Sequence, residues 1–256
     1  MHTVAIIGAG NVSQSLAPAL KKAGFNIVQV YSRTYEHAED LAEKVGAKPA
    51  FSISDLQADY YIITVPDSNI EEVASYLPNT NSVVLHTSGS THIDILKPYC
   101  DNYGVLYPMQ TFSKSKPVEF ESIPVFIEAN SPAAMEKVKS LADKLTTKVA
   151  ELNSEKRMGL HISAVFSCNF FNNMLASAFD ICNKHGIDMQ TLRPLVEETL
   201  NKAFDTGNPY KVQTGPAVRG DQITIAKHLE LLKDNPELQK IYELISAHIY
   251  HMHHSY

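Results

Sequence analysis

Two glycines near the start of the chain are spaced to hold a phosphate group. The apolar run from Thr3 to Ile7 leads directly into Gly8 and Gly10, and a helical pattern begins at Asn11. Gly8 permits a sharp turn, and Gly10 lets backbone amides at the positive end of the helix dipole approach an anion without a Cβ in between. The pattern predicts a pyrophosphate site for a dinucleotide, made of Gly8, Ala9, Gly10, Asn11, Val12 and Ser13.

The end of the second predicted strand carries an arginine where an NAD-binding fold usually has a carboxylate. The sequence there reads Ser32, Arg33, Thr34, and the first carboxylate, Glu36, already belongs to the next helix. A guanidinium between two hydroxyl groups offers planar, charged donors to a 2′-phosphate. We therefore expect NADP as the cofactor, bound here by Ser32, Arg33 and Thr34. The alternative is a helix-entry turn in which Thr34 is the N-cap and Arg33 points into solvent.

Polar turns at three further strand ends are candidates for the nicotinamide half of the site. Ligands of an open α/β sheet bind outside the carboxyl ends of its strands, and these turns follow residues 60–65, 82–86 and 104–107. Residues expected to border the nicotinamide are Val65, Pro66, Asp67, Ser68, Thr87 and Ser88. Gln110 is expected to contact the substrate. Each turn taken alone can also be explained as loop or helix-cap chemistry.

A titratable side chain and an amide lie on the long helix expected after residue 154. His161, Val165 and Asn169 follow one another at intervals of four, which in an α-helix places the imidazole and the amide on one face. The ordinary pKa of histidine suits proton transfer at neutral pH. We assign His161 as the proton donor or acceptor and Asn169 as the group that orients the substrate. The alternative is a histidine and an asparagine satisfied within the core.

Two other groups of functional residue types occur near the C-terminus. Arg219 lies between flexible residues and is expected to bind an anionic group of the substrate, whereas Asp221 is typical of the N-cap of the next helix. The tail carries histidines at irregular spacing with no accompanying carboxylate, namely His248, His251, His253 and His254. We interpret this tail as a solvated helix end and expect no metal site.

Apolar runs that alternate with amphipathic stretches predict βα repeats up to residue 153. Strands are expected at 3–7, 26–31, 60–65, 82–86, 104–107, 124–128 and 148–151. Helices are expected at 11–23, 35–45, 69–77, 91–100 and 132–145, the last with Ser131 as its N-cap. Beyond residue 154 only helices are expected, at 155–185, 189–204, 222–233 and 236–250. The sequence therefore predicts an α/β chain, with a Rossmann domain (a doubly wound, mostly parallel sheet) over 1–153 and an all-helical substrate and dimerisation domain over 154–256.

Composition narrows the class of protein. The 256 residues carry a formal net charge of −6, which provides no basic surface for nucleic acid. Three widely spaced cysteines are typical of reduced thiols in a cytosolic protein. The first strand begins almost at residue 1, which leaves no room for a signal peptide, and no apolar run is long enough to span a membrane. We expect a cytoplasmic protein with a small-molecule substrate and neither a membrane nor a nucleic-acid partner.

The motifs together resemble a known group of reductases. The GAGNVS turn, the corner at Arg33, the Val65-Pro66-Asp67 turn and the HTSGS turn are similar to the NADP-binding half of the pyrroline-5-carboxylate reductase and 6-phosphogluconate dehydrogenase superfamily, often labelled the deazaflavin-dependent NADP oxidoreductase family. The segments HISAVFSCNFFNN and TGPAVRGDQITIAKHL resemble the uncharacterised helical domain of a bacterial subgroup of oxidoreductases. The resemblance covers nearly the whole chain. It implies a homodimer formed through the helical domains, as does the apolar stripe from Leu160 to Cys182.

Two departures from the resemblance concern chemistry. The subgroup often has His-Pro where Tyr107-Pro108 stands, which puts a role for position 107 in doubt. The lysine that hydroxyacid dehydrogenases carry four residues before an asparagine is missing here, since Lys156 lies too far from Asn169, and His161 is the nearest titratable substitute.

The sequence predicts an NADP-dependent oxidoreductase that transfers a hydride between NADP(H) and a small carbonyl, imine or hydroxyl substrate bound between the two domains. A non-catalytic NADP-binding sensor or assembly protein is the alternative, because it would share the N-terminal motifs without needing His161 or Arg219. A flavin or S-adenosylmethionine protein is disfavoured, since both usually have an acidic residue at the end of the second strand. The sequence specifies neither the substrate nor whether a deazaflavin takes part.

Overall fold

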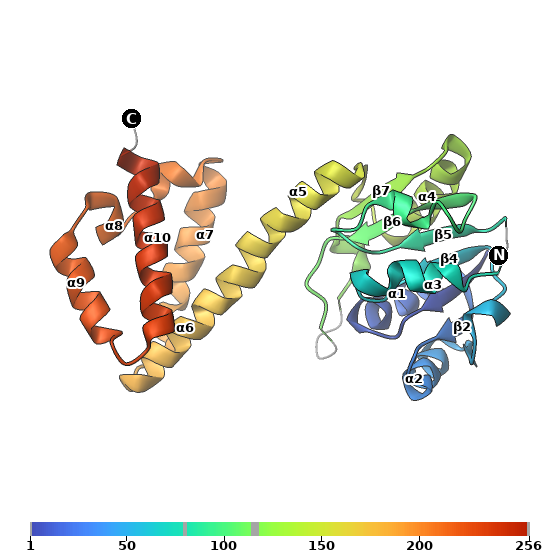
Figure 1. Ribbon diagram of the computed structural model, residues 1–256, viewed down its shortest axis with the longest axis horizontal. Helices are drawn as coiled ribbons and strands as arrows, with labels where there is room; N and C mark the ends of the chain where they lie inside the picture. The colour runs from blue at the N-terminus through green and yellow to red at the C-terminus, as the bar shows by residue number, and fades with distance from the viewer. Residues whose placement is uncertain (1, 79–80, 114–117, 255–256) are drawn as a thin grey trace. The chain divides into compact units, whose positions relative to one another are not determined.

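The computed structural model describes residues 2–78, 81–113 and 118–254. The chain divides into two compact units, Met1–Cys168 and Asn169–Tyr256. The first unit contains the sheet and the helices that cover it, and the second is helical (Figure 1). Residues 154–168, which the sequence analysis assigns to the helical domain, belong to the first compact unit. The expected functional boundary at residue 153 stays a prediction.

The first unit is built on one eight-stranded sheet with the order β3-β2-β1-β4-β5-β6-β7-β8. Neighbouring strands are parallel except for β6 and β7, which are antiparallel. The strands are β1 (Thr3–Ile7), β2 (Asn26–Tyr31), β3 (Lys48–Ala50), β4 (Tyr60–Ile63), β5 (Val83–His86), β6 (Asn102–Pro108), β7 (Val125–Ala129) and β8 (Val149–Glu151). This sheet confirms the predicted fold class. Only β3 was not expected, because a three-residue edge strand around a proline carries almost no periodic signal.

Alternation along the strands places apolar side chains on both faces of the sheet. Val4 and Ile6 of β1 belong to one buried cluster, and Ala5 and Ile7 belong to the other. The first cluster is covered by α1 (Asn11–Lys22), α2 (Tyr35–Val45) and α4 (Pro132–Leu145), and the second by α3 (Ile70–Ser75) with the 3₁₀ turns η1 (Ile53–Asp55) and η3 (Ile93–Leu96). Two further 3₁₀ turns are η2 (Asp67–Asn69) and η4 (Phe120–Ser122).

The prediction of a helix at 91–100 is wrong. Only the four residues of η3 are helical there, and they form a 3₁₀ turn whose N-cap is His92, which accepts a hydrogen bond from the backbone N–H of Asp94. Pro98 follows two residues after the turn. Proline cannot donate the backbone hydrogen bond that an α-helix needs and clashes with the preceding turn, so the segment cannot extend into a regular helix.

The long helix expected at 155–185 is three consecutive segments. It begins as α5 (Ser154–Ala164), continues as a π-helical segment, Val165–Phe170, and ends as α6 (Phe171–Lys184). Gly186, at a φ of 66°, follows the helix end, as the sequence predicts. The π segment pairs residues five apart rather than four. The α-helical spacing used to place Asn169 on the face of His161 therefore does not apply across it.

The second unit continues from α6 through α7 (Arg193–Asp205), α8 (Pro216–Arg219), α9 (Gln222–Leu231) and α10 (Pro236–His254), with 3₁₀ turns η6 (Met189–Leu192) and η7 (Pro209–Val212) (Figure 1). The short α8 was not expected. Asp221 caps α9 by accepting from the N–H of Thr224, and Ser131 caps α4 in the same way, as predicted. Within the described residues 169–254 only Cys182 and Ala217 are buried, so this unit has almost no core of its own.

Candidate active site

Gly8 makes the turn between β1 and α1, and the structure requires glycine there. Its φ is 109°, a region that side chains rarely tolerate, and a Cβ would lie 2.8 Å from the backbone oxygen of Thr64. Its N–H donates to the carbonyl oxygen of Tyr31 at 2.7 Å, which ties the turn to the end of β2. The carboxyl ends of β1, β2 and β4 therefore meet at this turn.

Gly10 is glycine for a different reason. A Cβ at Gly10 would meet no atom within 4 Å, so the space over the N-terminus of α1 is open. The backbone N–H groups of Asn11, Val12 and Ser13 have no acceptor inside the helix and can bind an anion there. Ser13 itself is fully buried, and its hydroxyl donates to the Gly10 oxygen at 2.9 Å. The small Ser13 side chain thus packs inward, and the turn fits a pyrophosphate.

The corner after β2 presents an exposed cation. Arg33 and Thr34 are exposed, Ser32 is half-buried, and Thr34 occupies the N-cap position of α2 without a side-chain hydrogen bond. Arg33 forms no ion pair with any residue that the structure describes. A free guanidinium beside two hydroxyl groups fits the 2′-phosphate expected from the sequence.

The turns after β4 and β5 are bonded to each other at the same edge of the sheet. Asp67, in the exposed turn from Pro66 to Ser68, accepts a hydrogen bond from the hydroxyl of Ser90. The hydroxyl of Thr87 donates to the backbone oxygen of Ile63 at 3.2 Å. The two turns on which the nicotinamide half was predicted are therefore neighbours.

The hydroxyl of Ser88 is hydrogen-bonded within its own loop. Its side-chain oxygen accepts from the N–H groups of Ser90 and Thr91 and donates to the Thr91 hydroxyl at 2.9 Å. The side chain is buried. A contact between Ser88 and a nicotinamide stays a prediction, and this hydroxyl is committed to the shape of the loop.

His86, at the end of β5, is a buried neutral histidine. Its Nδ1 accepts from the N–H of Ser88 at 3.2 Å, which assigns the ring proton to Nε2, and Nε2 has no partner among the described residues. Burial lowers the pKa of His86 to about 3, and the nearby Arg157 charge contributes to the same shift. His86 therefore stays uncharged near neutral pH and cannot be the proton donor.

The predicted proton donor, His161, lies on α5 against the end of β6. Its Nδ1 is 3.2 Å from the hydroxyl oxygen of Tyr107, and the two rings meet edge to face. A Cβ on Gly89 would lie 2.5 Å from the same Nδ1 and 2.9 Å from the Tyr107 ring, so only glycine leaves room for this contact. The imidazole, the phenol and the loop after β5 thus meet at the carboxyl ends of β5 and β6.

The sequence analysis did not assign a role to Tyr107. The side chain is 9% exposed, and burial raises the pKa of its phenol, an effect that the Arg157 charge partly opposes and the Asp67 charge increases. The phenol therefore stays protonated at neutral pH and can donate to or accept from His161. The feature of the sequence that could have indicated a role for Tyr107 is its place near the end of a buried strand.

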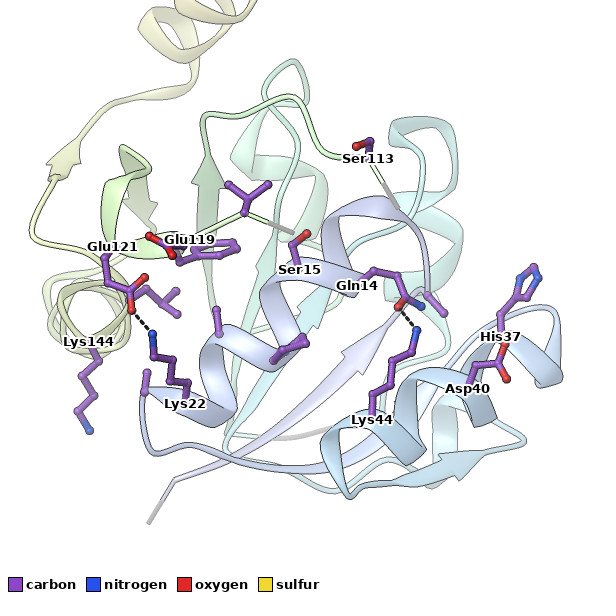
Figure 2. Close-up of a pocket in the computed structure, with 17 residues that line it drawn as sticks. Gln14, Ser15, Lys22, His37, Asp40, Lys44, Ser113, Glu119, Glu121 and Lys144 are labelled. Atoms are coloured by element: carbon purple, nitrogen blue, oxygen red, sulfur yellow. Dashed lines mark hydrogen bonds and ion pairs between the residues drawn. The ribbon is translucent and has the colours of Figure 1, made fainter. Parts of the chain in front are cut away.

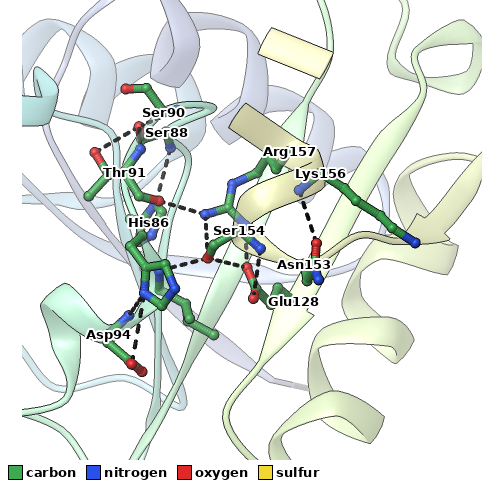
Figure 3. A network of polar contacts seen from close by, with 12 residues as sticks. His86, Ser88, Ser90, Thr91, Asp94, Glu128, Asn153, Ser154, Lys156 and Arg157 are labelled. Atoms are coloured by element: carbon green, nitrogen blue, oxygen red, sulfur yellow. Dashed lines mark hydrogen bonds and ion pairs between the residues drawn. The ribbon is translucent and has the colours of Figure 1, made fainter. Parts of the chain in front are cut away.

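A polar network, drawn in Figure 3, bonds α5 to β7 and to the loop after β5. Arg157 of α5 is 1% exposed, and its guanidinium donates to the carboxylate of Glu128 on β7 and to the backbone oxygen of Thr91. The same carboxylate accepts from the N–H of Ser154 at 3.0 Å and from its hydroxyl at 2.8 Å. That hydroxyl in turn accepts from the N–H of Ile93 at 3.0 Å. The sequence analysis missed this network, whose members are far apart along the chain.

Two of the predicted site residues belong to the second unit, and a third is exposed in the first unit. Asn169 is exposed at the first position of the second unit, and Arg219 is exposed on α8. Gln110 is exposed after β6, and its side-chain oxygen accepts from the N–H of Thr111 at 2.8 Å. Their contacts with a substrate stay predictions.

A groove of about 730 Å³ runs along the outer side of α1 (Figure 2). Its wall includes Ala9, and two of its lysines are bonded to neighbours: Lys22 contacts Glu121 at 2.5 Å and Lys44 contacts Gln14 at 2.9 Å. None of the strand-end residues described above, from Thr64 to Tyr107, lines it. The groove flanks the pyrophosphate turn without containing the His161 pair.

Two family descriptions match the chain. Residues 3–89 match "NADP oxidoreductase coenzyme F420-dependent", and residues 123–249 match a domain of unknown function, DUF2520. The crystal structure of "putative NADP oxidoreductase BF3122" from Bacteroides fragilis is 40% identical with a TM-score of 0.90, and the match covers 97% of this chain and 98% of that one. The chain belongs to this family of NADP oxidoreductases.

More distant structures share the fold of the NADP oxidoreductase family. An imine reductase from Myxococcus stipitatus in complex with NADP⁺ is 18% identical, with a TM-score of 0.65 over 97% of this chain and 91% of that one. A 1-pyrroline-5-carboxylate reductase from Streptococcus pyogenes is 18% identical, with a TM-score of 0.61 over 100% and 99%. The curated shikimate biosynthesis protein AroDE of Chlamydia trachomatis is 49% identical over 53 residues, and the matched segment is only 11% of that protein.

These comparisons confirm the resemblance stated from the motifs, and NADP is the cofactor of the NADP oxidoreductase family to which the chain belongs. In the described part of the chain no helix is both long and apolar enough to cross a membrane. The described residues also contain no group of three or more His, Cys, Asp or Glu arranged to hold a metal ion.

Proposed function

We propose that this NADP-dependent oxidoreductase reduces a small imine or carbonyl compound, or oxidises the corresponding amine or alcohol, with His161 as the proton-transfer group. The observation that carries the proposal is the contact between His161 and Tyr107 beside Gly89. It lies at the edge of the sheet where β1 and β4, with the glycine turn, also end. A group able to move a proton therefore lies at the edge of the sheet where we expect the cofactor to bind.

The cofactor, when bound, supplies or accepts the hydride. The residues of the chain then have separate tasks. The amides of Asn11, Val12 and Ser13 bind the pyrophosphate, and the free guanidinium of Arg33 binds the 2′-phosphate. Ser32 and Thr34 add hydroxyl groups at that corner, and the turn from Val65 to Ser68, with Thr87 and Ser88, borders the nicotinamide.

His161 completes the proton balance. When a carbon atom of the substrate receives the hydride, its nitrogen or oxygen partner must receive one proton, and we assign that proton to His161 in its charged form. Because Nδ1 faces Tyr107, Nε2 is the ring nitrogen available to the substrate. In the opposite direction neutral His161 accepts the proton. Tyr107 holds the ring orientation and the tautomer.

We retain Asn169 as the group that orients the substrate carbonyl or imine, with Gln110 and Arg219 as further substrate contacts. Arg219 would favour a substrate that carries a carboxylate or phosphate. We also retain the proposal of a cytoplasmic homodimer. The three cysteines are free, and burial raises the pKa of the Cys100 thiol to about 12, which supports an unreactive, reduced thiol.

The test begins with a thermal-shift screen of NADP(H), NAD(H) and small imines, ketones and aldehydes. A ligand that binds only the native state raises Tm, by the equivalent of about 2.7 kcal/mol at a hundredfold excess over Kd. Substrates found in this way are then assayed by NADPH absorbance with wild type and His161→Gln. If NADPH binds but no member of a broad panel is turned over, and His161→Gln changes only Tm, the non-catalytic sensor becomes the better account.

A further inference from the structure

Two charged residues with no part in cofactor binding or proton transfer, a buried arginine and a half-buried glutamate, lie next to the candidate site. Arg157 is 1% exposed, and the side chain of Glu128 is 15% exposed. A buried ion pair is weak as a source of stability, because removing both charges from water costs about as much as their attraction returns. Its directional bonds, by contrast, specify geometry closely.

We propose that Arg157 and Glu128 position His161. They fasten the first turn of α5 to the sheet and to the loop after β5, and so set where the imidazole stands. The proposal rests on the role of His161 proposed above, and it adds a second pair of residues on which that role depends.

Arg157 bonds α5 to the loop after β5, and Figure 3 shows its contacts with Thr91 and Glu128. The guanidinium of Arg157 donates to the backbone oxygen of Thr91. Gly89, two residues earlier in the same loop, packs against His161. His161 lies one turn after Arg157 on α5, and residues four apart lie on the same face of a helix. The helix and the loop that meet at His161 are therefore bonded to each other one turn away.

Glu128 bonds the first turn of α5 to the sheet. Its carboxylate accepts from Arg157 and twice from Ser154, which is the first residue of α5. Glu128 lies on β7, paired with β6, and its register partner Val105 is two residues from Tyr107. The strand pair that carries Tyr107 thus also fixes the start of the helix that carries His161.

The first test needs neither substrate nor cofactor. The full-length protein with ¹³C-labelled histidine and tyrosine rings is examined by NMR, with the His161 resonance assigned from His161→Gln. Wild type should show a nuclear Overhauser effect between the rings of His161 and Tyr107. Glu128→Gln should weaken it and shift the His161 resonance, because the amide lacks the negative charge and one of the two acceptor oxygens that bond Arg157 and Ser154. Arg157→Lys, which keeps the charge but has one nitrogen in place of the two that reach Glu128 and Thr91, should retain it in part.

The matched control is Glu121→Gln, which removes the carboxylate of an exposed ion pair with Lys22. It should leave the His161 resonance unchanged. If Glu128→Gln does not fold, Ser154→Ala decides, since it removes only the hydroxyl that Glu128 and Ile93 share. An unchanged Overhauser effect in the folded variants at positions 128, 154 and 157 would overturn the proposal.

The second test uses any substrate that the screen identifies. A displaced proton donor should lower kcat by up to about 10²-fold, while the Kd of NADPH, measured by fluorescence, stays at the wild-type value in Glu128→Gln and Arg157→Lys. Loss of cofactor affinity in step with kcat would contradict positioning. The two proposals fail separately: full activity of His161→Gln rejects the proposed function, whereas an intact ring contact in the variants at positions 128 and 157 rejects only the positioning role.

Discussion

The hydroxyl oxygen of Tyr107 lies 3.2 Å from Nδ1 of His161, although 54 residues separate them in the chain. Tyr107 ends a buried strand, and His161 lies on the helix that follows the sheet. Gly89, from a third segment, is in contact distance of both rings. The contact among Tyr107, Gly89 and His161 links the sheet to a group that can transfer a proton. The first two predictions follow from this contact.

Removing either member of the pair should affect turnover and spare cofactor binding. His161→Gln removes the proton-transfer group, so we expect kcat to fall by roughly 10²–10⁴-fold. Tyr107→Phe removes only the hydroxyl that orients the ring, so its loss should be smaller and should shift the pH dependence of kcat. Steady-state kinetics and NADPH titration check both. A wild-type pH profile in a fully active Tyr107→Phe would show that the contact has no catalytic role.

Gly89→Ala should displace His161 without touching any charged group. The added methyl would stand 2.5 Å from Nδ1 of the ring, so the imidazole must move, and a shift of about 1 Å can cost around 10²-fold in rate. Gly159→Ala on α5 is the matched control, because its methyl would meet no atom within 4 Å. That control should raise stability by about 0.5–1 kcal/mol. Equal activity of the two variants would refute the crowding argument.

His86 should make the protein sensitive to acid. Its pKa is lowered to about 3 in the folded state, against an ordinary value of 6.5. The unfolded chain therefore binds a proton first as pH falls below 6.5. Stability from this group is complete above pH 6.5 and is lost between there and about pH 3, by a total on the order of 5 kcal/mol.

Denaturant unfolding of wild type and His86→Gln at pH 7.5 and 5.0 measures this effect. Glutamine has no proton to bind in this range, so the variant should lose less stability between the two pH values than wild type. His92→Gln, at an exposed position in the same region, is the control: it removes the cap of η3, and the change in its stability between the two pH values should match that of wild type. An equal pH dependence in wild type and His86→Gln would rule out His86 as the source.

Arg33 should determine the preference for NADP(H) over NAD(H), by at least about tenfold in Kd. Its guanidinium is unpaired among the described residues and would lose one charge-assisted contact on mutation, worth about 1.5–3 kcal/mol. Titration calorimetry should show that Arg33→Ala weakens NADPH binding and leaves NADH binding nearly unchanged. Lys139→Ala, a charge removed from the exposed outer face of α4, should change neither affinity. Equal affinity of wild type for both cofactors would refute the assignment.

The second unit should bring two copies of the chain together. Large apolar side chains stay exposed on its helices, including Leu195 at 66% and Leu244 at 74%, and burying such surface is the usual driving force for association. Sedimentation equilibrium should report about twice the 28.4 kDa chain mass. Leu244→Glu should shift the equilibrium toward monomer, whereas Tyr76→Glu, an exposed aromatic of the first unit, should not. A wild-type monomer at micromolar concentration would contradict this prediction.

Local patterns accounted for most of the elements. The strand runs, the glycine turn and the caps Ser131 and Asp221 depend on residues within a few positions of each other, so the chain reveals them directly. The errors arose where the backbone departs from the regular α-helix that the apolar periodicity predicts. Pro98 and the His92 cap leave a 3₁₀ turn in place of the helix at 91–100, and the π segment divides the long helix near Asn169.

By itself the sequence determined the nucleotide-binding class of the chain, the NADP preference suggested by Arg33 and the candidacy of His161. Only the tertiary structure decided which groups surround His161. Tyr107, Gly89 and the pair Arg157 and Glu128 come from segments that the order of the strands brings to one edge of the sheet. That order depends on long-range strand pairing and on burial, which no short window of sequence contains, so the partners of a reactive group appear only when the sheet is assembled.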